Sequence, residues 1–237
     1  MKPVPIVAEL FTSEGCSSCP PADDLLRRLV EEQPIEGVVI IGLSEHVDYW
    51  DRLGWKDPFS SPKFSRRQEE YSQVFGEDRI YTPQMIVAGR DEMVGSEAER
   101  IQAAIAKAAK RPMAVVSVEG GSASAGKRSA AVRIEVRDVP EAARRGDLAV
   151  VLAIIENGLE SHVGAGENAR RTLKHSAVTR SLLPVATLSK GSSSGSFATE
   201  VALAPGWNAK QLRVVAFLQN PRTHEIHGAA STALTGQ

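Results

Sequence analysis

Two cysteines three positions apart are the residues of this sequence best suited to chemistry. Cys16 and Cys19 are its only cysteines, and they lie in the segment 11–21, between an apolar stretch and a helical pattern. A thiol at a helix N-terminus meets unpaired backbone N–H groups and the positive end of the helix dipole, and both stabilise the thiolate. The spacing also lets the second sulfur reach back and resolve a mixed disulfide. We therefore predict a thiol–disulfide oxidoreductase in which Cys16 is the exposed nucleophile and Cys19 is the resolving thiol.

This prediction needs no organic cofactor, because the dithiol itself carries two electrons, and the substrate would be a protein or small-molecule thiol or disulfide. Zinc sites of this type use a second pair of ligands, and the sequence has no further cysteine, so we expect no zinc. Two functions other than the oxidoreductase stay open. Cys16, Cys19 and His46 could instead bind Cu(I), which prefers soft ligands, as in a metallochaperone. The third possibility is a non-catalytic interaction protein whose cysteines are buried and inert.

The segments on either side of the cysteines predict a strand, a helix and a second strand. Residues 4–11 are apolar and form the first expected strand, and residues 38–43 form the second. Between them, from Ala22 to Val30, apolar residues recur at i, i+3, i+4, i+7 and i+8, which is the period of a helix. Strands joined by a helix in this way form a crossover, so the two strands should be parallel.

The first half continues to alternate between helices and strands. The remaining expected elements are a helix that begins at Ser61-Pro62, a hairpin of strands over 84–88 and 92–94, and a helix over about 96–109. Ser96 and Glu99 fit a capping box at the start of the last helix.

The pattern changes after Pro112, where helical periodicity stops. Strand patterns separated by turn residues then cover 113–119, 130–137, 148–156, 196–204 and 212–219. Strands at this spacing suggest an antiparallel sandwich. We therefore expect an α/β domain over residues 1–111, followed by an all-β, immunoglobulin-like sandwich domain over residues 112–237.

Several short motifs together resemble a known family. They are Glu9–Ser13, Cys16–Asp23, His46–Asp51, Gly54–Phe59 and Tyr81–Gln84, which read ELFTS, CSSCPPAD, HVDYWD, GWKDPF and YTPQ. In these motifs the chain is similar to a family of uncharacterised bacterial thioredoxin-like proteins, many of them secreted, within the thioredoxin superfamily. The resemblance covers most of the first domain and extends into the second through Gly166–Asn168 and Val215–Gln219. It implies a thioredoxin-like fold with an insertion over about 46–75, and a redox site whose substrate is not settled.

In the thioredoxin superfamily, a Thr-Pro pair with a cis peptide bond packs beside the cysteines. The resemblance therefore implies that Pro83 follows a cis bond and shapes the substrate groove, and that the backbone of Thr82 pairs with a bound polypeptide or thiol. The alternative for Pro83 is an ordinary proline at the entrance to a strand. Ser17 and Ser18 replace the Gly-Pro of thioredoxin, so the sequence does not say whether the site reduces or oxidises its substrate.

Four further residues are candidates for the same site. Glu9 lies on the first strand, where thioredoxins hold a buried acid offset by one residue, and it could relay protons to Cys19 or simply face outward. His46 follows the second strand, where ligands gather in parallel sheets, and it could assist proton transfer or only form a hydrogen bond. Trp50 and Trp55 could line a peptide groove or anchor an ordered loop.

Composition narrows the possible partners. The chain has 28 Lys and Arg against 29 Asp and Glu, so there is no basic surplus for nucleic acid. No apolar run reaches about 18 residues, and we expect no membrane span.

The first residues bear on the compartment. They lack the succession of charged, apolar and small residues that is typical of a signal peptide. We therefore expect a cytoplasmic protein, or a periplasmic or secreted one if a signal peptide precedes residue 1. The sequence makes no prediction of the oligomeric state.

Overall fold

The computed structural model describes residues 3–120 and 129–234, which divide into two compact units. Unit 1 comprises Met1–Lys110, Asn157–Thr179 and Arg222–His224, and unit 2 comprises the remaining segments. The first boundary lies between Lys110 and Arg111, next to the predicted one. However, two segments that we assigned to the second domain, Asn157–Thr179 and Arg222–His224, group with unit 1. We call Asn157–Thr179 the inserted segment; it is a different part of the chain from the insertion predicted over about 46–75.

The centre of unit 1 is a sheet around its first strand. Strand β1 (Val4–Thr12) is parallel to β2 (Val38–His46), and helix α1 (Pro20–Glu32) connects the two. On its other side β1 is antiparallel to β3 (Gln84–Val87), which forms a hairpin with β4 (Asp91–Val94). The predicted parallel crossover and the predicted hairpin are therefore both confirmed.

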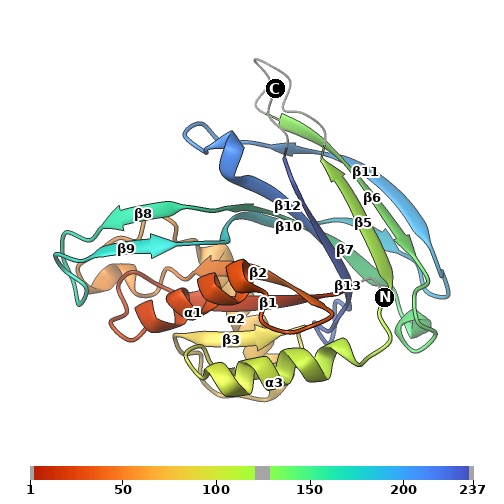
Figure 1. Cartoon of the computed structure of the whole chain (residues 1–237), viewed down its shortest axis with the longest axis horizontal. Coiled ribbons are helices and arrows are strands. Elements are labelled where there is room, and N and C mark those ends of the chain that lie inside the picture. The colour runs from red at the N-terminus through yellow and green to blue at the C-terminus, as the bar shows by residue number, and fades with distance from the viewer. Residues whose placement is uncertain (1–2, 121–128, 235–237) are drawn as a thin grey trace. The chain divides into compact units, whose positions relative to one another are not determined.

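Helix α3 (Ala98–Ala109) packs against β1 and lies alongside β3 (Figure 1). Its first turn differs from the prediction, because the N-cap residue is Glu97 and no side chain caps the helix. The first helical hydrogen bond runs from the N–H of Ile101 to the carbonyl of Glu97. The helix thus begins one residue later than the capping box of Ser96 and Glu99 requires, and that prediction was wrong.

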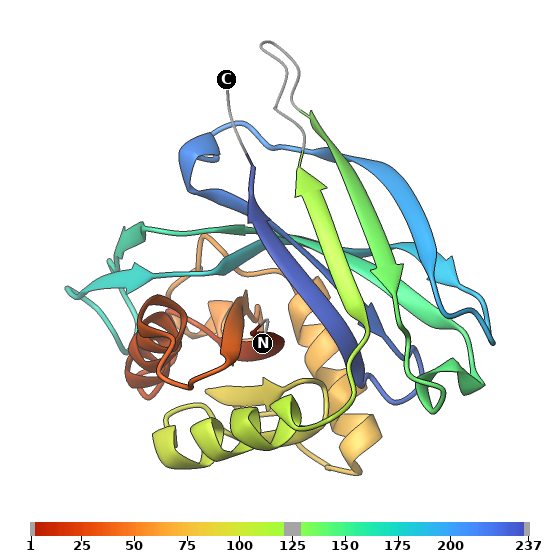
Figure 2. The same ribbon diagram turned by 45° about the vertical axis from the view of Figure 1, so that its right-hand side comes forward.

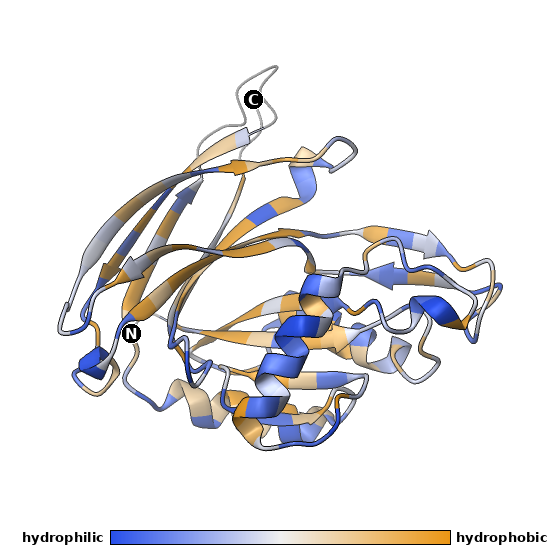
Figure 3. Cartoon of the chain, turned by 180° about the vertical axis from the view of Figure 1, so that it is seen from behind, coloured by the Kyte–Doolittle hydropathy of each residue, from blue (hydrophilic) through white to orange (hydrophobic). Residues whose placement is uncertain are grey.

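Helix α2 (Pro62–Phe75) begins at the predicted serine and proline. The Ser61 side chain accepts a hydrogen bond from the backbone N–H of Lys63. The helix is nearest the viewer in Figure 3, where most of its residues are hydrophilic. Even its buried side carries polar residues, including Arg67 and Gln68. A polar buried face needs polar partners on the sheet. Strands β1 and β2 supply Glu9 and Glu45 to Arg67, and β3 supplies Gln84 to Gln68.

The inserted segment adds a small hairpin to unit 1. Strands β8 (Leu159–His162) and β9 (Thr172–His175) are antiparallel and lie side by side (Figure 2). Helix α1 packs against β9. Directly after the hairpin, the carbonyl of Ala177 accepts a hydrogen bond from the N–H of Ser44, and Val178 pairs with Ser44 in parallel. The segment therefore contacts both α1 and β2.

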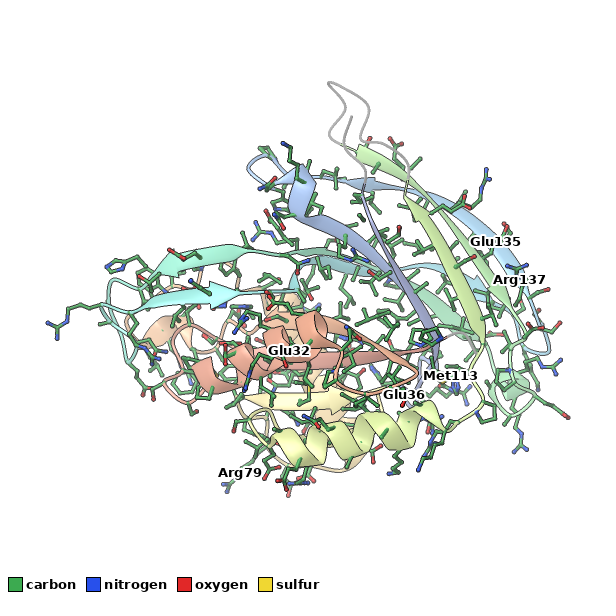
Figure 4. The ribbon with its side chains drawn as sticks, in the orientation of Figure 1. Glu32, Glu36, Arg79, Met113, Glu135 and Arg137 are labelled. Atoms are coloured by element: carbon green, nitrogen blue, oxygen red, sulfur yellow. A yellow bond between two sulfur atoms is a disulfide. The ribbon has the colours of Figure 1, made fainter. Side chains whose placement is uncertain are left out.

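Unit 2 consists of two sets of strands around one core. Strand order is β11 (Gly195–Ala202), β6 (Ser129–Arg137) and β5 (Val115–Gly120) in a three-stranded sheet. The other set, β13 (Ile226–Ala233), β12 (Leu212–Gln219), β7 (Leu148–Glu156) and β10 (Val178–Leu188), consists of consecutive strands of an eight-stranded sheet. Apolar residues from both sets form a single hydrophobic cluster. Alternate residues of β6 face this core, whereas Glu135 and Arg137 point away from it (Figure 4).

Gly95 lies where the cysteine-bearing helix meets the Thr82-Pro83 turn. A Cβ at this position would come within 3.0 Å of Pro83 Cβ and 3.1 Å of Ala22 Cβ, and within 2.7 Å of Leu10 Cδ1. The first two atoms are fixed to the backbone and cannot rotate away. This packing therefore requires a residue without a side chain at position 95.

We expect Gly95→Ala to lower the free energy of unfolding by about 1–3 kcal/mol, because overpacking a dense core forces neighbours to shift. The matched control is Gly146→Ala, where an added Cβ meets no heavy atom within 4 Å. The measurement is urea unfolding followed by tryptophan fluorescence. Equal midpoints for the two variants would contradict the close packing around Gly95.

Candidate functional site

The two cysteines form a disulfide at the start of α1. Cys16 and Cys19 are bonded to each other, with their Cα atoms 5.4 Å apart. Cys19 is the N-cap of α1, and its carbonyl accepts hydrogen bonds from the N–H groups of Ala22 and Asp23 at 2.8 and 3.1 Å. Pro20 takes the first helical position, where no N–H is needed. The predicted placement of the pair at a helix N-terminus is therefore confirmed.

Burial of the disulfide differs from our expectation. Cys16 and Cys19 both have 0% exposed surface, while Ser17 and Ser18 between them are exposed. The Ser18 hydroxyl lies 3.4 Å from Cys16 Sγ, and the carbonyl oxygen of Thr82 lies 3.9 Å from it. The prediction that Cys16 is exposed was therefore wrong for the disulfide state, because neighbouring segments cover its sulfur.

The Thr82–Pro83 turn is one of these segments. Its peptide bond is cis, as the resemblance implies. The indole N–H of Trp50 donates to the Thr82 hydroxyl at 2.8 Å, and the indole N–H of Trp55 donates to Glu14 Oε2 at 2.7 Å. Both tryptophans are half-buried. Their polar atoms thus anchor loops next to the disulfide, and a role in binding substrate stays a prediction.

The loop between β8 and β9 holds the cysteine turn from the other side. Asn168 is buried, and its amide donates to the backbone carbonyls of Glu14 and Cys16, each at 2.9 Å. The guanidinium of Arg171 donates to Asn168 Oδ1 at 2.7 Å. The exposed Glu167 accepts the backbone N–H of Ser17 at 2.9 Å, and hydrogen bonds from Ser17 lower the pKa of Glu167. The inserted segment therefore fixes the backbone on both sides of Cys16.

A buried pair of His46 and Asp57 lies beneath this turn. His46 Nδ1 is 2.7 Å from Asp57 Oδ2, which also accepts the backbone N–H of Glu14 at 2.8 Å. Burial lowers the pKa of His46, but the neighbouring Asp57 carboxylate outweighs it and the net shift is upward. Burial raises the pKa of Asp57, but His46 and the backbone N–H groups hold it below its usual value. The two shifts describe an ion pair.

A second histidine comes from the inserted segment. His175 Nε2 lies 3.0 Å from Glu14 Oε1, and both residues are buried. The rings of His175 and His46 are 5.0 Å apart, with Phe59 edge-on to both at 5.4 Å. The predicted His46 is therefore part of a larger polar cluster, to which Glu14, Asp57 and His175 also belong and which sequence analysis missed.

Glu9 does not belong to this cluster. Its carboxylate accepts hydrogen bonds from Arg67 Nε at 2.7 Å and from the Tyr71 hydroxyl at 2.5 Å, both on α2. Leu10, its neighbour on β1, instead approaches Ala22 of α1 around Gly95. Successive strand residues point to opposite faces, so Glu9 lies on the face opposite to α1. The predicted relay from Glu9 to Cys19 has no support in this geometry.

No group of three or more His, Cys, Asp or Glu side chains within the described residues is arranged to hold a metal ion. His46 uses Nδ1 for Asp57, and the two sulfurs are bonded to each other. The Cu(I) site considered above stays an untested alternative. Among the described residues, no helix is both long and apolar enough to cross a membrane.

A family model and two solved structures match almost the whole chain. A family model described as a protein of unknown function (DUF1223) matches residues 7–219. The crystal structure of a protein from Agrobacterium tumefaciens is similar at 27% identity, with a TM-score of 0.73, over 99% of this chain and 96% of that one. HBP35 of Porphyromonas gingivalis shares the fold at 16% identity, with a TM-score of 0.71, over 99% of this chain and 76% of that one. No curated protein matches.

The buried Asn168 amide allows a direct test of the clamp on the cysteine turn. Asn168→Ala leaves the carbonyls of Glu14 and Cys16 without this donor, and we expect a loss of about 1–3 kcal/mol in the free energy of unfolding. Asn208→Ala is a comparison variant, since Asn208 is exposed and its side chain caps a three-residue 3-10 helix by accepting the N–H of Lys210. A urea midpoint for Asn168→Ala equal to that of the unaltered protein would show that the clamp contributes nothing.

The pKa shifts predict two separable histidine titrations. His46 should titrate above pH 6.5 because of Asp57, and His224 should titrate below it because burial and the nearby Arg67 disfavour its charge. The stabilisation of the fold by the pair of His46 and Asp57 is then fully present between pH 3.8 and pH 6.5, the ordinary pKa values of the two groups. It is lost as pH rises through the raised pKa of His46 or falls through the lowered pKa of Asp57. Two-dimensional NMR of the imidazoles against pH measures both; the reverse order would contradict the ion pair.

Proposed function

The chain belongs to the family of proteins of unknown function DUF1223, so its activity has to be inferred from the site, and we propose that it is a thiol–disulfide oxidoreductase. The observation that carries the proposal is the disulfide between Cys16 and Cys19 at the first turn of α1. In the dithiol state, the unpaired N–H groups and dipole of that turn would favour a thiolate on Cys16. Two cysteines in a chain of 237 residues do not make a structural disulfide framework.

We also propose that unit 1 has a thioredoxin-like fold and unit 2 an immunoglobulin-like sandwich. The parallel β1–α1–β2 crossover, the disulfide after β1 and the cis Thr82–Pro83 bond before β3 support the first assignment. The two antiparallel sets of strands around one core support the second. In this view the backbone of Thr82, beside Cys16 Sγ, is where a substrate chain would pair.

The reaction balances without any further cofactor. In the reducing direction, the Cys16 thiolate attacks a substrate disulfide, breaks its S–S bond and releases one substrate thiolate. Cys19 then gives up its proton and attacks Cys16 Sγ, which breaks the mixed disulfide and releases the second thiolate. The substrate gains two electrons and two protons, and the dithiol becomes the disulfide. The oxidising direction is the reverse, and the substrate is a protein or small-molecule disulfide or thiol.

A second candidate is a non-catalytic interaction protein with an inert disulfide. The observation in its favour is that both cysteines lack exposed surface. Structural disulfides are thermodynamically resistant to reduction, with potentials below about −300 mV. The reduction potential therefore separates the two candidates.

We expect equilibration in glutathione buffers, followed by acid quenching, alkylation and mass spectrometry, to give one reversible two-electron transition of Cys16 and Cys19. Its potential should fall between about −270 and −120 mV, the range of known thiol–disulfide enzymes. Cys19→Ser is the control for alkylation of Cys16, because it cannot form the bond. A pair that stays oxidised in every buffer until the protein is denatured would exclude the oxidoreductase and favour the inert disulfide.

A further inference from the structure

Four buried polar atoms around the first turn of α1 have no hydrogen-bond partner. They are Thr12 Oγ1, Asp23 Oδ1, His46 Nε2 and His175 Nδ1, none of which has a partner at strict hydrogen-bond geometry. Thr12 and Asp23 nevertheless lie close enough for a weaker hydrogen bond that lowers the pKa of Asp23. Buried polar atoms are normally paired, and a cluster of exceptions points to a functional role. Thr12 and His46 are register partners in β1 and β2, and the His46 and His175 rings are 5.0 Å apart. The atoms come from four different elements and meet behind the disulfide.

The two histidines are held in matching ways. His46 is fixed through Nδ1 by Asp57, and His175 is fixed through Nε2 by Glu14. A carboxylate on one ring nitrogen sets the ring orientation and the tautomer. In each ring the second nitrogen is buried and has no hydrogen-bond partner.

Asp23 connects this cluster to the second cysteine. It lies four residues after Cys19 in α1, and its N–H donates to the Cys19 carbonyl at 3.1 Å, so both side chains lie on one face of the helix. Helical side chains lean toward the N-terminus, which brings the carboxylate of Asp23 toward Cys19. The residue is half-buried, but its Oδ1 atom is out of contact with solvent.

The surroundings of Asp23 shift the pKa of its carboxyl group upward. Burial raises its pKa, and the nearby His175, His46 and Thr12 partly oppose this shift, while Asp57 adds to it. A general base works best when its pKa lies close to the working pH. An upward shift from 3.8 therefore improves Asp23 as a proton acceptor near neutrality.

We propose that Asp23 accepts the proton of the Cys19 thiol when Cys19 resolves the mixed disulfide. The inference rests on the proposed oxidoreductase function and names a residue for its second step. The proton moves from Cys19 Sγ to the Asp23 carboxylate, the new thiolate attacks Cys16 Sγ, and the substrate sulfur leaves with the electron pair. In the oxidising direction Asp23 returns the proton to Cys19.

The two steps can be separated with one equivalent of 5,5′-dithiobis(2-nitrobenzoate) and the reduced protein in stopped flow. Attack by Cys16 releases the first thionitrobenzoate, and attack by Cys19 on the mixed disulfide releases the second. We expect Asp23→Asn to slow the second release at pH 7 by about tenfold or more, within the usual contribution of a general base, and to leave the first unchanged. The difference should disappear toward pH 9, where the thiol ionises without help.

The matched control is Asp24→Asn, one position along the same helix. Asp24 is exposed and forms surface ion pairs with Arg27 and Arg28, so we expect neither release to change. Equal second-phase rates for Asp23→Asn and the unaltered protein would overturn the proposal and leave the oxidoreductase intact. An equal slowing of both phases at every pH would also overturn it, since that indicates a structural effect. Release of no thionitrobenzoate by the unaltered protein would overturn both.

The unaltered protein supplies a second test if Asp23→Asn does not fold. The second release should slow as pH falls through the raised pKa of Asp23, whereas the first release should follow the ionisation of Cys16 alone. The charged and titratable groups facing Asp23 are His46 and Asp57 on the β2 side and His175 on β9. Identical pH profiles for the two phases would contradict a separate proton acceptor for Cys19.

Discussion

The structure of the site depends on the burial of Glu14, two residues before the first cysteine. A buried carboxylate is costly unless it is paired and hydrogen-bonded. Glu14 meets this requirement with partners from two distant segments: Trp55 and His175 bind its carboxylate. Its backbone is held as well, because Asp57 accepts its N–H and Asn168 donates to its carbonyl. The cysteine turn, the loop after β2 and the inserted segment are therefore joined at this one residue.

The same requirement organises the opposite face of the sheet. There Glu9 is paired with Arg67 and accepts the hydroxyl of Tyr71, all three being buried. Burial and the neighbouring Glu9 raise the pKa of Glu45, although Arg67 opposes the shift. Unit 1 thus buries two polar clusters, one on each side of β1. Only the cluster that contains Glu14 lies next to the disulfide, and for this reason the proton chemistry is assigned to Asp23, which His46, His175 and Asp57 of this cluster surround.

Sequence patterns predicted the first half of the chain well because its signals are local. Apolar runs and helical spacing predicted β1, α1 and β2, and Ser61 with Pro62 marked the start of α2. Burial of the disulfide could not be predicted in this way. The carbonyl oxygen of Thr82 near the Cys16 sulfur and the Asn168 amide that holds the cysteine turn come from segments 66 and 152 residues away from Cys16 in the chain. Strands β8 and β9 have only four residues each, too few for a reliable alternation.

Charged residues were the hardest candidates to assign to a face of the sheet. A strand glutamate with apolar neighbours has the same local sequence pattern on either face. Glu9 was expected either near Cys19 or facing outward, and it is buried on the α2 side. Glu14 and Asp23 carry no pattern of their own, although Glu14 lies just before the cysteine motif and Asp23 is its last residue. His175 was not among the predicted site residues, because its partner Glu14 is 161 residues away in the chain. The signal that was present is the motif match at Gly166–Asn168, which contains the buried Asn168 itself.

The central claim is that the buried disulfide between Cys16 and Cys19 reacts in the folded protein. The most direct test compares its rate of reduction by dithiothreitol under native conditions with the rate of global unfolding, both extrapolated to the same buffer. The account predicts reduction that is much faster than unfolding and proportional to the dithiothreitol concentration. Reduction limited to the unfolding rate, and independent of the reductant concentration, would show that the bond opens only when the fold is lost.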